Sequence, residues 1–162
     1  MSIFVVRHAK ASSRREWVGD DRLRPLTTSG RRQAAMLAER LRDETVTGLW
    51  SSPYLRCTET LAPLGRRLDR PVVDEPRLAE GAAFESTLEL LREVGDGAVL
   101  CSHGDVIPDL VQALVRRGTV LRTPPDWRKA SVWVLDAPDA DGAVATAAAE
   151  PPPGGSPEPR SR

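Results

Sequence analysis

The sequence predicts an α/β fold with three layers, in which helices cover both faces of a mostly parallel central sheet. Short apolar runs, often β-branched, alternate with stretches whose apolar residues recur at helical spacing. Such alternation is typical of parallel sheets, whose ligand sites lie at the carboxyl ends of the strands. The 162 residues suit one domain with its own core. Their 40% hydrophobic and 28% charged residues are ordinary for a globular protein.

Four short apolar runs are expected to form the parallel strands. Each is bounded by polar residues, glycine or proline, which is the pattern of a short buried strand. They occupy residues 3–8, 47–52, 70–76 and 97–104. Three of them end in polar clusters, at Arg7 and His8, at Ser51 and Ser52, and at Ser102 and His103. Parallel strands would bring these clusters to one edge of the sheet.

Four amphipathic segments are expected to form the helices, at residues 27–44, 52–68, 84–95 and 105–118. Thr27 or Thr28 can cap the first, because a hydroxyl accepts from the free N–H groups of the first turn. Ser52 is the expected cap of the second, with Pro53 at its first position, where a missing N–H does no harm. Gly95 is the expected end of the third helix.

The last part of the chain divides into a hairpin and a tail. Residues 130–149 look like two strands with Asp141 and Gly142 in the turn between them. Residues 150–162 are rich in proline and glycine and hold no apolar residue to anchor them, so we expect a disordered tail. The expected domain therefore covers residues 1–149.

Charge and composition narrow the classes of partner. Lysine plus arginine equals aspartate plus glutamate at 23 each, so no global field favours nucleic acid or a membrane surface. The first quarter of the chain is rich in arginine, which fits a small anionic ligand, with a solvated basic face as the alternative. Cys57 and Cys101 lack the spacing of a disulfide or zinc pair. Without a signal segment or an apolar run of about 20 residues, the expected location is the cytoplasm.

The two histidines of the chain occupy the same local context. His8 and His103 each end a predicted buried strand, and each precedes a small residue, Ala9 or Gly104. A small residue there allows a ligand to approach the backbone closely. One such histidine is usually structural or exposed, but the repeated context favours a shared site.

Two arginines extend this candidate site. Arg7 and Arg56 carry guanidiniums that form forked bonds to oxyanions at any working pH. Neighbouring strand residues point to opposite faces, so Arg7 and His8 share a site only if the chain turns there. Arg56 would lie near a helix start, which also favours an anion; an exposed helix arginine is the alternative. Together these groups suit a phosphoryl group.

One reaction fits these groups. The sequence has no P-loop, no carboxylate cluster for Mg²⁺ and no Cys-x5-Arg nucleophile loop. A neutral imidazole held in one tautomer is a nucleophile, so His8 is expected to attack phosphorus, and water then hydrolyses the phosphohistidine. The arginines and a protonated His103 would stabilise the phosphoryl oxygens.

The leaving oxygen needs a proton, for which two carboxyl groups are candidates. Glu80 lies in a predicted loop, where mobile catalytic acids are often placed, with a solvated loop glutamate as the alternative. Asp105 follows His103 closely, but it is equally well explained as the cap of the next helix. The choice between Glu80 and Asp105 stays open.

Four motifs together resemble the histidine phosphatase superfamily, the phosphoglycerate mutase-like group. VVRHAKA resembles its RHG signature, with Ala9 in place of the glycine. RPLTTSGRRQA is similar to its helix entry, SSPYLRCTET to its S-S-P-x-x-R-x-x-x-T segment, and LCSHGDVI to its second-histidine motif. The resemblance implies a phosphoglycerate mutase-like fold, His8 as the phosphorylated nucleophile, and a phosphate pocket of Arg7, Arg56 and His103. Glu80, in an L-x-E context, resembles the family's acid, and neither a metal nor an organic cofactor is implied.

Two branches of this superfamily imply different substrates. The compact length is closest to the short SixA-like phosphohistidine phosphatases, which act on a phosphohistidine protein. Residues 12–27 look more like the phosphatase domain that follows a Nudix domain in some actinobacterial MutT-type hydrolases. That likeness implies a nucleotide or other small phosphorylated substrate and a functional link to a Nudix hydrolase, and it is preferred. No Nudix motif occurs here, so the chain would be a free-standing version or a fragment.

The loop after His8 is expected to choose the substrate. Lys10 and Arg14 are the candidate binding residues, and Trp17 can either stack on a base or pack on its own loop. Arg14 stands where many mutases carry a phosphate-binding Asn, and the long mutase insertions are absent, which argues against a mutase. A non-catalytic phosphate-binding module is disfavoured, because binding alone needs no nucleophilic imidazole.

Overall fold

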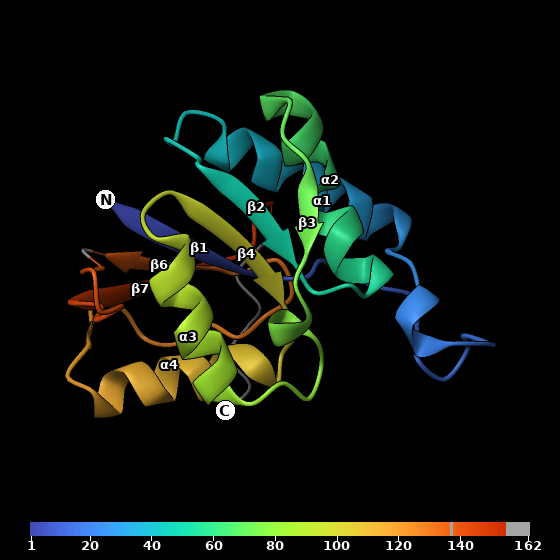
Figure 1. Cartoon of the computed structure of the whole chain (residues 1–162). Helices are drawn as coiled ribbons and strands as arrows, with labels where there is room; N and C mark the ends of the chain where they lie inside the picture. Colours follow the sequence, from blue (N-terminus) through green and yellow to red (C-terminus); the bar gives the residue numbers. More distant parts are fainter. Residues whose placement is uncertain (137, 155–162) are drawn as a thin grey trace.

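A mixed sheet of seven strands forms the centre of the computed structural model, which describes residues 1–136 and 138–154 (Figure 1). The strands lie in the order β3-β2-β4-β1-β6-β7-β5. Their bounds are β1 Ser2–Arg7, β2 Gly48–Ser51, β3 Val72–Asp74, β4 Ala98–Ser102, β5 Val120–Leu121, β6 Val132–Asp136 and β7 Thr146–Glu150. The predicted α/β fold is confirmed, and the strands β1 to β4 are the four parallel strands that the apolar runs predicted.

The register of the parallel strands aligns the ends that carry the polar clusters. Arg7, the last residue of β1, pairs with Ser102 at the end of β4, and Ser51 at the end of β2 pairs with Cys101. β4 is the strand between β1 and β2. The residues that follow these three strands therefore emerge side by side at one edge of the sheet.

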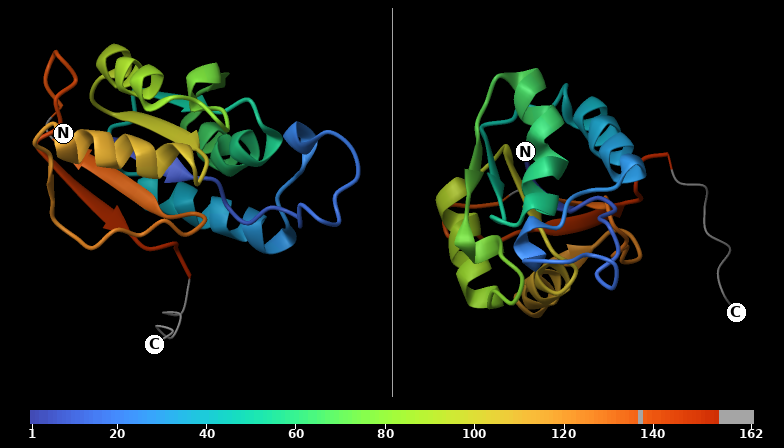
Figure 2. Two further views of the ribbon diagram at one scale, coloured as in Figure 1. Left: turned by 90° about the horizontal axis from the view of Figure 1, so that it is seen from below. Right: turned by 90° about the vertical axis from the view of Figure 1, so that its right-hand side faces the viewer.

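Helices cover both faces of the sheet, as the two layers in Figures 1 and 2 show. One core joins α1 (Thr28–Leu41) and α2 (Leu55–Leu68) to Phe4 and Val6 of β1. The other joins α3 (Phe84–Val94) and α4 (Val106–Arg116) to Ile3 and Val5. Successive residues of β1 thus serve opposite cores, because a strand alternates its side chains between faces.

Two of the helix caps expected from the sequence are present in the structure, and two are not. The hydroxyl of Thr27 accepts from the N–H of Gly30 at 3.0 Å, as a cap does, and Gly95 follows α3 with a φ of 65°. The prediction that Ser52 caps α2 is wrong, because α2 begins at Leu55 and has no side-chain cap. Asp105 precedes α4, but its carboxylate does not cap the helix either.

The carboxyl-terminal hairpin is confirmed. β6 runs antiparallel to both β1 and β7, and Gly142 in the connection has a φ of 76°. Three elements have no counterpart in the sequence-based expectation: β5, and the 3₁₀ helices η1 (Asp21–Leu23) and η2 (Pro76–Leu78). Glu150, expected to open the tail, is the last residue of β7, and residues 155–162 of that expected tail lie outside the described residues.

None of the helices in the described part of the chain is long and apolar enough to cross a membrane.

Candidate active site

A cavity of about 450 Å³ lies where β1 and β4 end. Its lining comes from segments far apart in the sequence: Arg7, His8, Ala11, Ser12, Ser13, Arg14, Arg24, Arg56, Glu80, His103, Gly104, Asp105 and Lys129. The candidate residues of the sequence analysis are therefore brought together, with the exception of Lys10, which does not line the cavity. The segment between β1 and α1 extends beyond the strand ends and forms one wall (Figures 1 and 2).

Arg7 and His8 share the cavity because β1 ends between them. The N–H of His8 donates to the carbonyl of Ser102 on β4 at 3.0 Å, but the strand itself ends at Arg7. The N–H of Ala9 turns to the hydroxyl of Thr60 on α2 at 3.0 Å. This turn at the end of β1 lets two neighbouring residues line one cavity.

His8 is a buried, neutral imidazole in one tautomer. Its Nδ1 lies 2.8 Å from the carbonyl oxygen of Ala9, and since a carbonyl only accepts, Nδ1 carries the hydrogen. Burial, with smaller contributions from the charges of His103 and two arginines, lowers the pKa of His8 to about 3, although the hydrogen bond to Ala9 acts in the opposite direction. The lone pair is therefore on Nε2 over the ordinary pH range, which is the form that a nucleophile needs.

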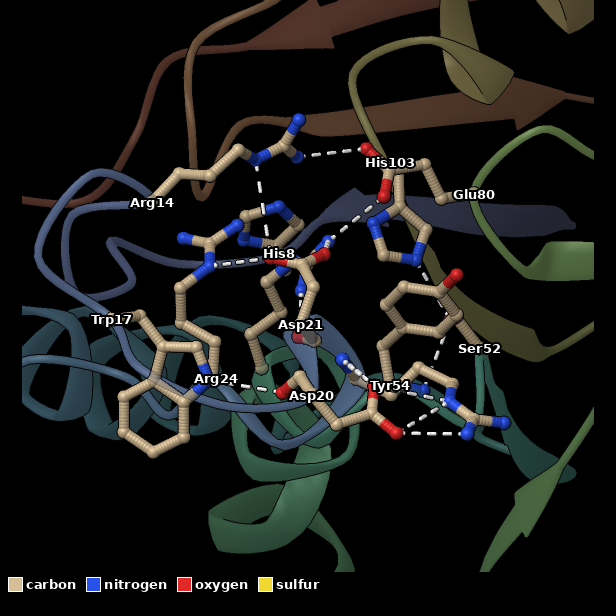
Figure 3. A network of polar contacts seen from close by, with 12 residues as sticks. His8, Arg14, Trp17, Asp20, Asp21, Arg24, Ser52, Tyr54, Glu80 and His103 are labelled. Atoms are coloured by element: carbon tan, nitrogen blue, oxygen red, sulfur yellow. Dashed lines mark hydrogen bonds and ion pairs between the residues drawn. The ribbon is translucent and has the colours of Figure 1, made fainter.

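His103 is held from the side opposite the cavity. Its Nε2 lies 2.7 Å from the hydroxyl of Ser52, and the ring of Tyr54 packs edge-on at 4.8 Å. The rings of His8 and His103 are 5.4 Å apart at 66°. With Nε2 engaged by Ser52, Nδ1 is the nitrogen of His103 that is left on the side of His8 (Figure 3).

Arg56 is the second residue of α2 and is only 1% exposed, so an exposed helix arginine is excluded. Its Nη1 donates to the carbonyl of Asp21 at 2.9 Å. Its Nη2 donates to the carboxylates of Asp21 and Glu80 at 3.1 and 3.2 Å. Its Nε is buried without a partner among the described residues. A guanidinium anchored in this way is preorganised for an oxyanion.

Arg7 is the second guanidinium at the end of β1. It donates to the carbonyl of Trp127, and its buried Nε also has no partner within the described part of the chain. Burial lowers the pKa of Arg7, while Asp105 acts in the opposite direction. A Cβ added to Gly104 would lie 2.6 Å from Cζ of Arg7. The absence of a side chain at Gly104 therefore makes room for this guanidinium.

Glu80 joins two arginines of the cavity lining. The hydroxyl of Ser102 donates to the carbonyl of Leu78 at 2.6 Å, which holds η2 against β4 and places Glu80 two residues further on. One oxygen of Glu80 accepts from Arg14 at 2.9 Å (Figure 3). The other oxygen accepts from Arg56 at 3.2 Å. Asp105 lies nearby, because its carboxylate accepts from the N–H of Gly81 at 2.8 Å.

Three charged residues of this site were not among the predicted site residues. Asp21 of η1 binds Arg24 at 2.9 Å and Arg56 at 3.1 Å, and lies 3.9 Å from Arg14. Burial acts to raise the pKa of Asp21, but these guanidiniums outweigh it and lower the value. Arg24 and Lys129 line the cavity directly. The cluster of arginines was a signal for Arg24, whereas Lys129, in another part of the chain, had none.

Trp17 packs on its own loop. Its indole N–H donates to the carbonyl of Asp20 at 2.9 Å, and the side chain does not line the cavity (Figure 3). Cys57 and Cys101 are both buried free thiols. Among residues 1–136 and 138–154, no group of three or more His, Cys, Asp and Glu side chains is placed to hold a metal ion.

The fold and the site thus define an α/β protein with a cationic cavity around two buried imidazoles. A sequence profile of the histidine phosphatase superfamily (branch 1) matches residues 3–85, just over half of the chain. The chain belongs to this superfamily. It is 36% identical to the 8-oxo-(d)GTP phosphatase of Mycolicibacterium smegmatis over 147 residues, which cover 86% of this chain and 45% of that protein. The chain spans less than half the length of the curated relatives it matches.

Solved structures of other phosphatases have a similar fold. The protein histidine phosphatase SixA complexed with tungstate superimposes with a TM-score of 0.70 at 26% identity, covering 89% of this chain and 92% of that one. A mycobacterial glucosyl-3-phosphoglycerate phosphatase complexed with VO3 gives a TM-score of 0.69 at 18% identity, covering 88% and 94%. The second likeness is one of fold alone.

Proposed function

We propose that this protein is a phosphatase that transfers the phosphoryl group of its substrate to His8 and then to water. The observation that carries the proposal is the state of His8, a buried imidazole with its hydrogen on Nδ1 and its lone pair on Nε2. Arg7, Arg56 and His103 line the same cavity and supply the donors that a phosphoryl group needs.

In the first step Nε2 of His8 attacks phosphorus, the N–P bond forms and the bond from phosphorus to the leaving oxygen breaks. The imidazole gains positive charge, which the Ala9 carbonyl stabilises through its hydrogen bond from Nδ1. In the second step water attacks phosphorus and the N–P bond breaks, so phosphate leaves and neutral His8 is restored. Arg7, Arg56 and His103 stabilise the charge on the phosphoryl oxygens in both steps.

We infer that Glu80 donates the proton to the leaving oxygen. Its Oε2 occupies a donor of Arg56 at 3.2 Å. A phosphoryl group bound by Arg56 would compete for that donor and free the carboxyl group next to the ester oxygen. Asp105 is the second candidate, since it lines the same cavity and is bonded to the residue that follows Glu80.

We infer a small phosphorylated substrate, such as a nucleotide. The 36% identity to a protein named 8-oxo-(d)GTP phosphatase supports this class. A cavity of about 450 Å³ also falls in the range of roughly 300–1,000 Å³ that small-molecule sites have. The structural likeness to SixA favours a phosphohistidine protein as the second candidate. For a nucleotide substrate, we also propose that the enzyme has a functional link to a Nudix hydrolase.

A trapping experiment tests the mechanism. Mixing the protein with ³²P-labelled substrate, followed by a rapid quench without acid, should trap an acid-labile phosphoenzyme on His8. His8→Ala should give neither label nor turnover. Label on serine or cysteine, or turnover by His8→Ala, would refute the mechanism. Comparing kcat/KM for nucleotides, sugar phosphates and a phosphohistidine protein then decides between the two substrate classes.

A further inference from the structure

Lys129 differs from the arginines of the cavity lining in having no partner among the residues that the structure describes. It lies in the connection between β5 and β6 and lines the cavity, but its ammonium makes no hydrogen bond or ion pair with any residue that the structure describes. Each arginine of the lining is anchored to protein acceptors: Arg7 to the Trp127 carbonyl, Arg14 to Glu80, Arg24 to Asp21 and the Ser12 carbonyl, and Arg56 to Asp21 and Glu80.

The backbone fixes Lys129 beside the end of β1. The next residue, Ala130, is fully buried and has a φ of 66°, a left-handed conformation that non-glycine residues adopt only where the surroundings impose it. Its N–H donates to the carbonyls of both Arg7 and His8, at 3.1 and 3.2 Å. Lys129 is therefore held close to the proposed nucleophile by main-chain bonds.

The surroundings of Lys129 are cationic. Its half-buried position lowers its pKa, and the charges of Arg7, Arg24, Lys10 and Arg56 lower it further. An ammonium without an acceptor among other cations is unfavourable in the free protein. An anion bound beside it would remove that cost and would also gain a charge-assisted hydrogen bond.

We propose that Lys129, together with Arg24, which lines the same cavity, binds a second anionic group of the substrate, the phosphate adjacent to the one transferred to His8. The inference rests on the proposed function, because the second group is defined relative to the phosphoryl group on His8. Arg7, Arg56 and His103 bind the transferred phosphoryl group. Lys129 is then available to bind the adjacent phosphate. The substrate class is then a phosphoanhydride, such as a nucleoside di- or triphosphate, rather than a monoester.

The chemical step balances with water as the only co-reactant. Nε2 of His8 bonds the terminal phosphorus, and the bond from that phosphorus to the bridging oxygen breaks. The leaving group is the adjacent phosphate, whose oxygen receives the proton of Glu80 and whose remaining negative charge Lys129 stabilises. Water then cleaves the N–P bond, so the products are inorganic phosphate and the substrate shortened by one phosphoryl group.

Binding of two inert probes tests the second site without turnover. Titration calorimetry at constant salt should compare methylenediphosphonate, which has two anionic groups, with methylphosphonate, which has one. In Lys129→Gln, the affinity for methylenediphosphonate should fall about 10-fold, while that for methylphosphonate stays within about twofold. Arg122→Gln is the matched control, because Arg122 is exposed in the same connection, does not line the cavity, and loses the same charge. It should bind both probes as the wild type does.

Two binding results would overturn this inference: equal weakening of both probes by Lys129→Gln, or no change in either. A kinetic comparison distinguishes failure of the second site from failure of the proposed function. It measures the turnover of a nucleoside diphosphate and of the corresponding monophosphate by the wild type, His8→Ala and Lys129→Gln. Turnover that persists in His8→Ala refutes the phosphohistidine mechanism, while a selective loss of methylenediphosphonate binding in Lys129→Gln would still support the second site. His8-dependent turnover, with both substrates slowed equally by Lys129→Gln, overturns the second site alone.

Discussion

The hydroxyl of Ser52 lies 2.7 Å from Nε2 of His103, and this contact decides which nitrogen of that imidazole faces the cavity. Ser52 is itself fixed, because its oxygen accepts from the N–H of Tyr54 at 3.2 Å. A serine at the end of β2 thereby positions an imidazole at the end of β4. Ser52 does not itself line the cavity but bonds His103, which does, so it is a positioning residue.

Removing this hydroxyl should slow the chemical step more than it weakens binding. Ser52→Ala frees the His103 ring to turn, so we expect kcat to fall about 10-fold with a smaller change in KM. Ser51→Ala is the matched control, because the Ser51 hydroxyl is equally buried but donates to the Ser52 carbonyl and not to His103. Equal effects of the two variants, or a change confined to KM, would show that Ser52 has no such role.

A side chain at Gly104 should displace Arg7. The added Cβ of Gly104→Ala would lie 2.6 Å from Cζ of Arg7, so the guanidinium must move and kcat/KM should fall about 10- to 100-fold. Circular dichroism should show an unchanged fold. The test is a double-mutant cycle: in the Arg7→Ala background, Gly104→Ala should cause little further loss. The same additional loss in both backgrounds would mean that Gly104 acts on something other than Arg7.

Burial of neutral His8 should make the protein less stable in mild acid. Its pKa is about 3 in the folded chain and about 6.5 when unfolded, so between these values the unfolded chain binds the extra proton. The free energy of unfolding should therefore fall as the pH drops below about 6.5, by at most about 1.4 kcal/mol per pH unit for this group.

The measurement is urea unfolding at about pH 7 and about pH 5, for the wild type and for His8→Gln. The variant lacks this proton-binding group and should lose less stability between the two values. All other titrating groups are common to both proteins, so their effects cancel in the difference. An identical loss in both proteins would mean that His8 is not held neutral.

The convergence of the catalytic candidates was predictable because it follows from the topology of a parallel sheet. Arg7, Ser52 and His103 end strands that the apolar runs already located, and carboxyl ends of neighbouring parallel strands meet. The sequence showed only that Arg7 and His8 can share a cavity if the chain turns between them. It did not predict the turn itself. The turn depends on the contact of Ala9 with Thr60, which joins residues far apart in the sequence.

The errors and omissions have the same origin in tertiary contacts. Ser52 and Asp105 both precede helices and have the side chains of good caps, but each is engaged elsewhere, by His103 and by the N–H of Gly81. Lys129 reaches the cavity because Ala130 bonds the carbonyls at the end of β1. No local sequence pattern predicts such long-range bonds. A lysine such as Lys129, in a loop with two prolines, is therefore expected to be an exposed residue.

The general acid can be identified from the dependence of the rate on the leaving group. Glu80→Gln keeps the shape and the acceptor oxygen of the side chain but cannot supply a proton. We therefore expect it to slow an alkyl phosphate, whose leaving oxygen needs protonation, about 100-fold. An activated aryl phosphate such as p-nitrophenyl phosphate should be slowed only a few-fold. The same substitution also alters the bonds to Arg14 and Arg56, but that effect is common to both substrates and disappears from their ratio.

Asp105→Asn is the matched comparison, since Asp105 is the other carboxyl group in the cavity lining. If Glu80 is the acid, Asp105→Asn should slow both substrates by similar factors. The reverse pattern, a selective loss with Asp105→Asn, would transfer the role to Asp105. Equal slowing of the two substrates by both variants would mean that water protonates the leaving oxygen. In that case, the contacts of Glu80 with Arg14 and Arg56 would serve to hold the guanidiniums in place.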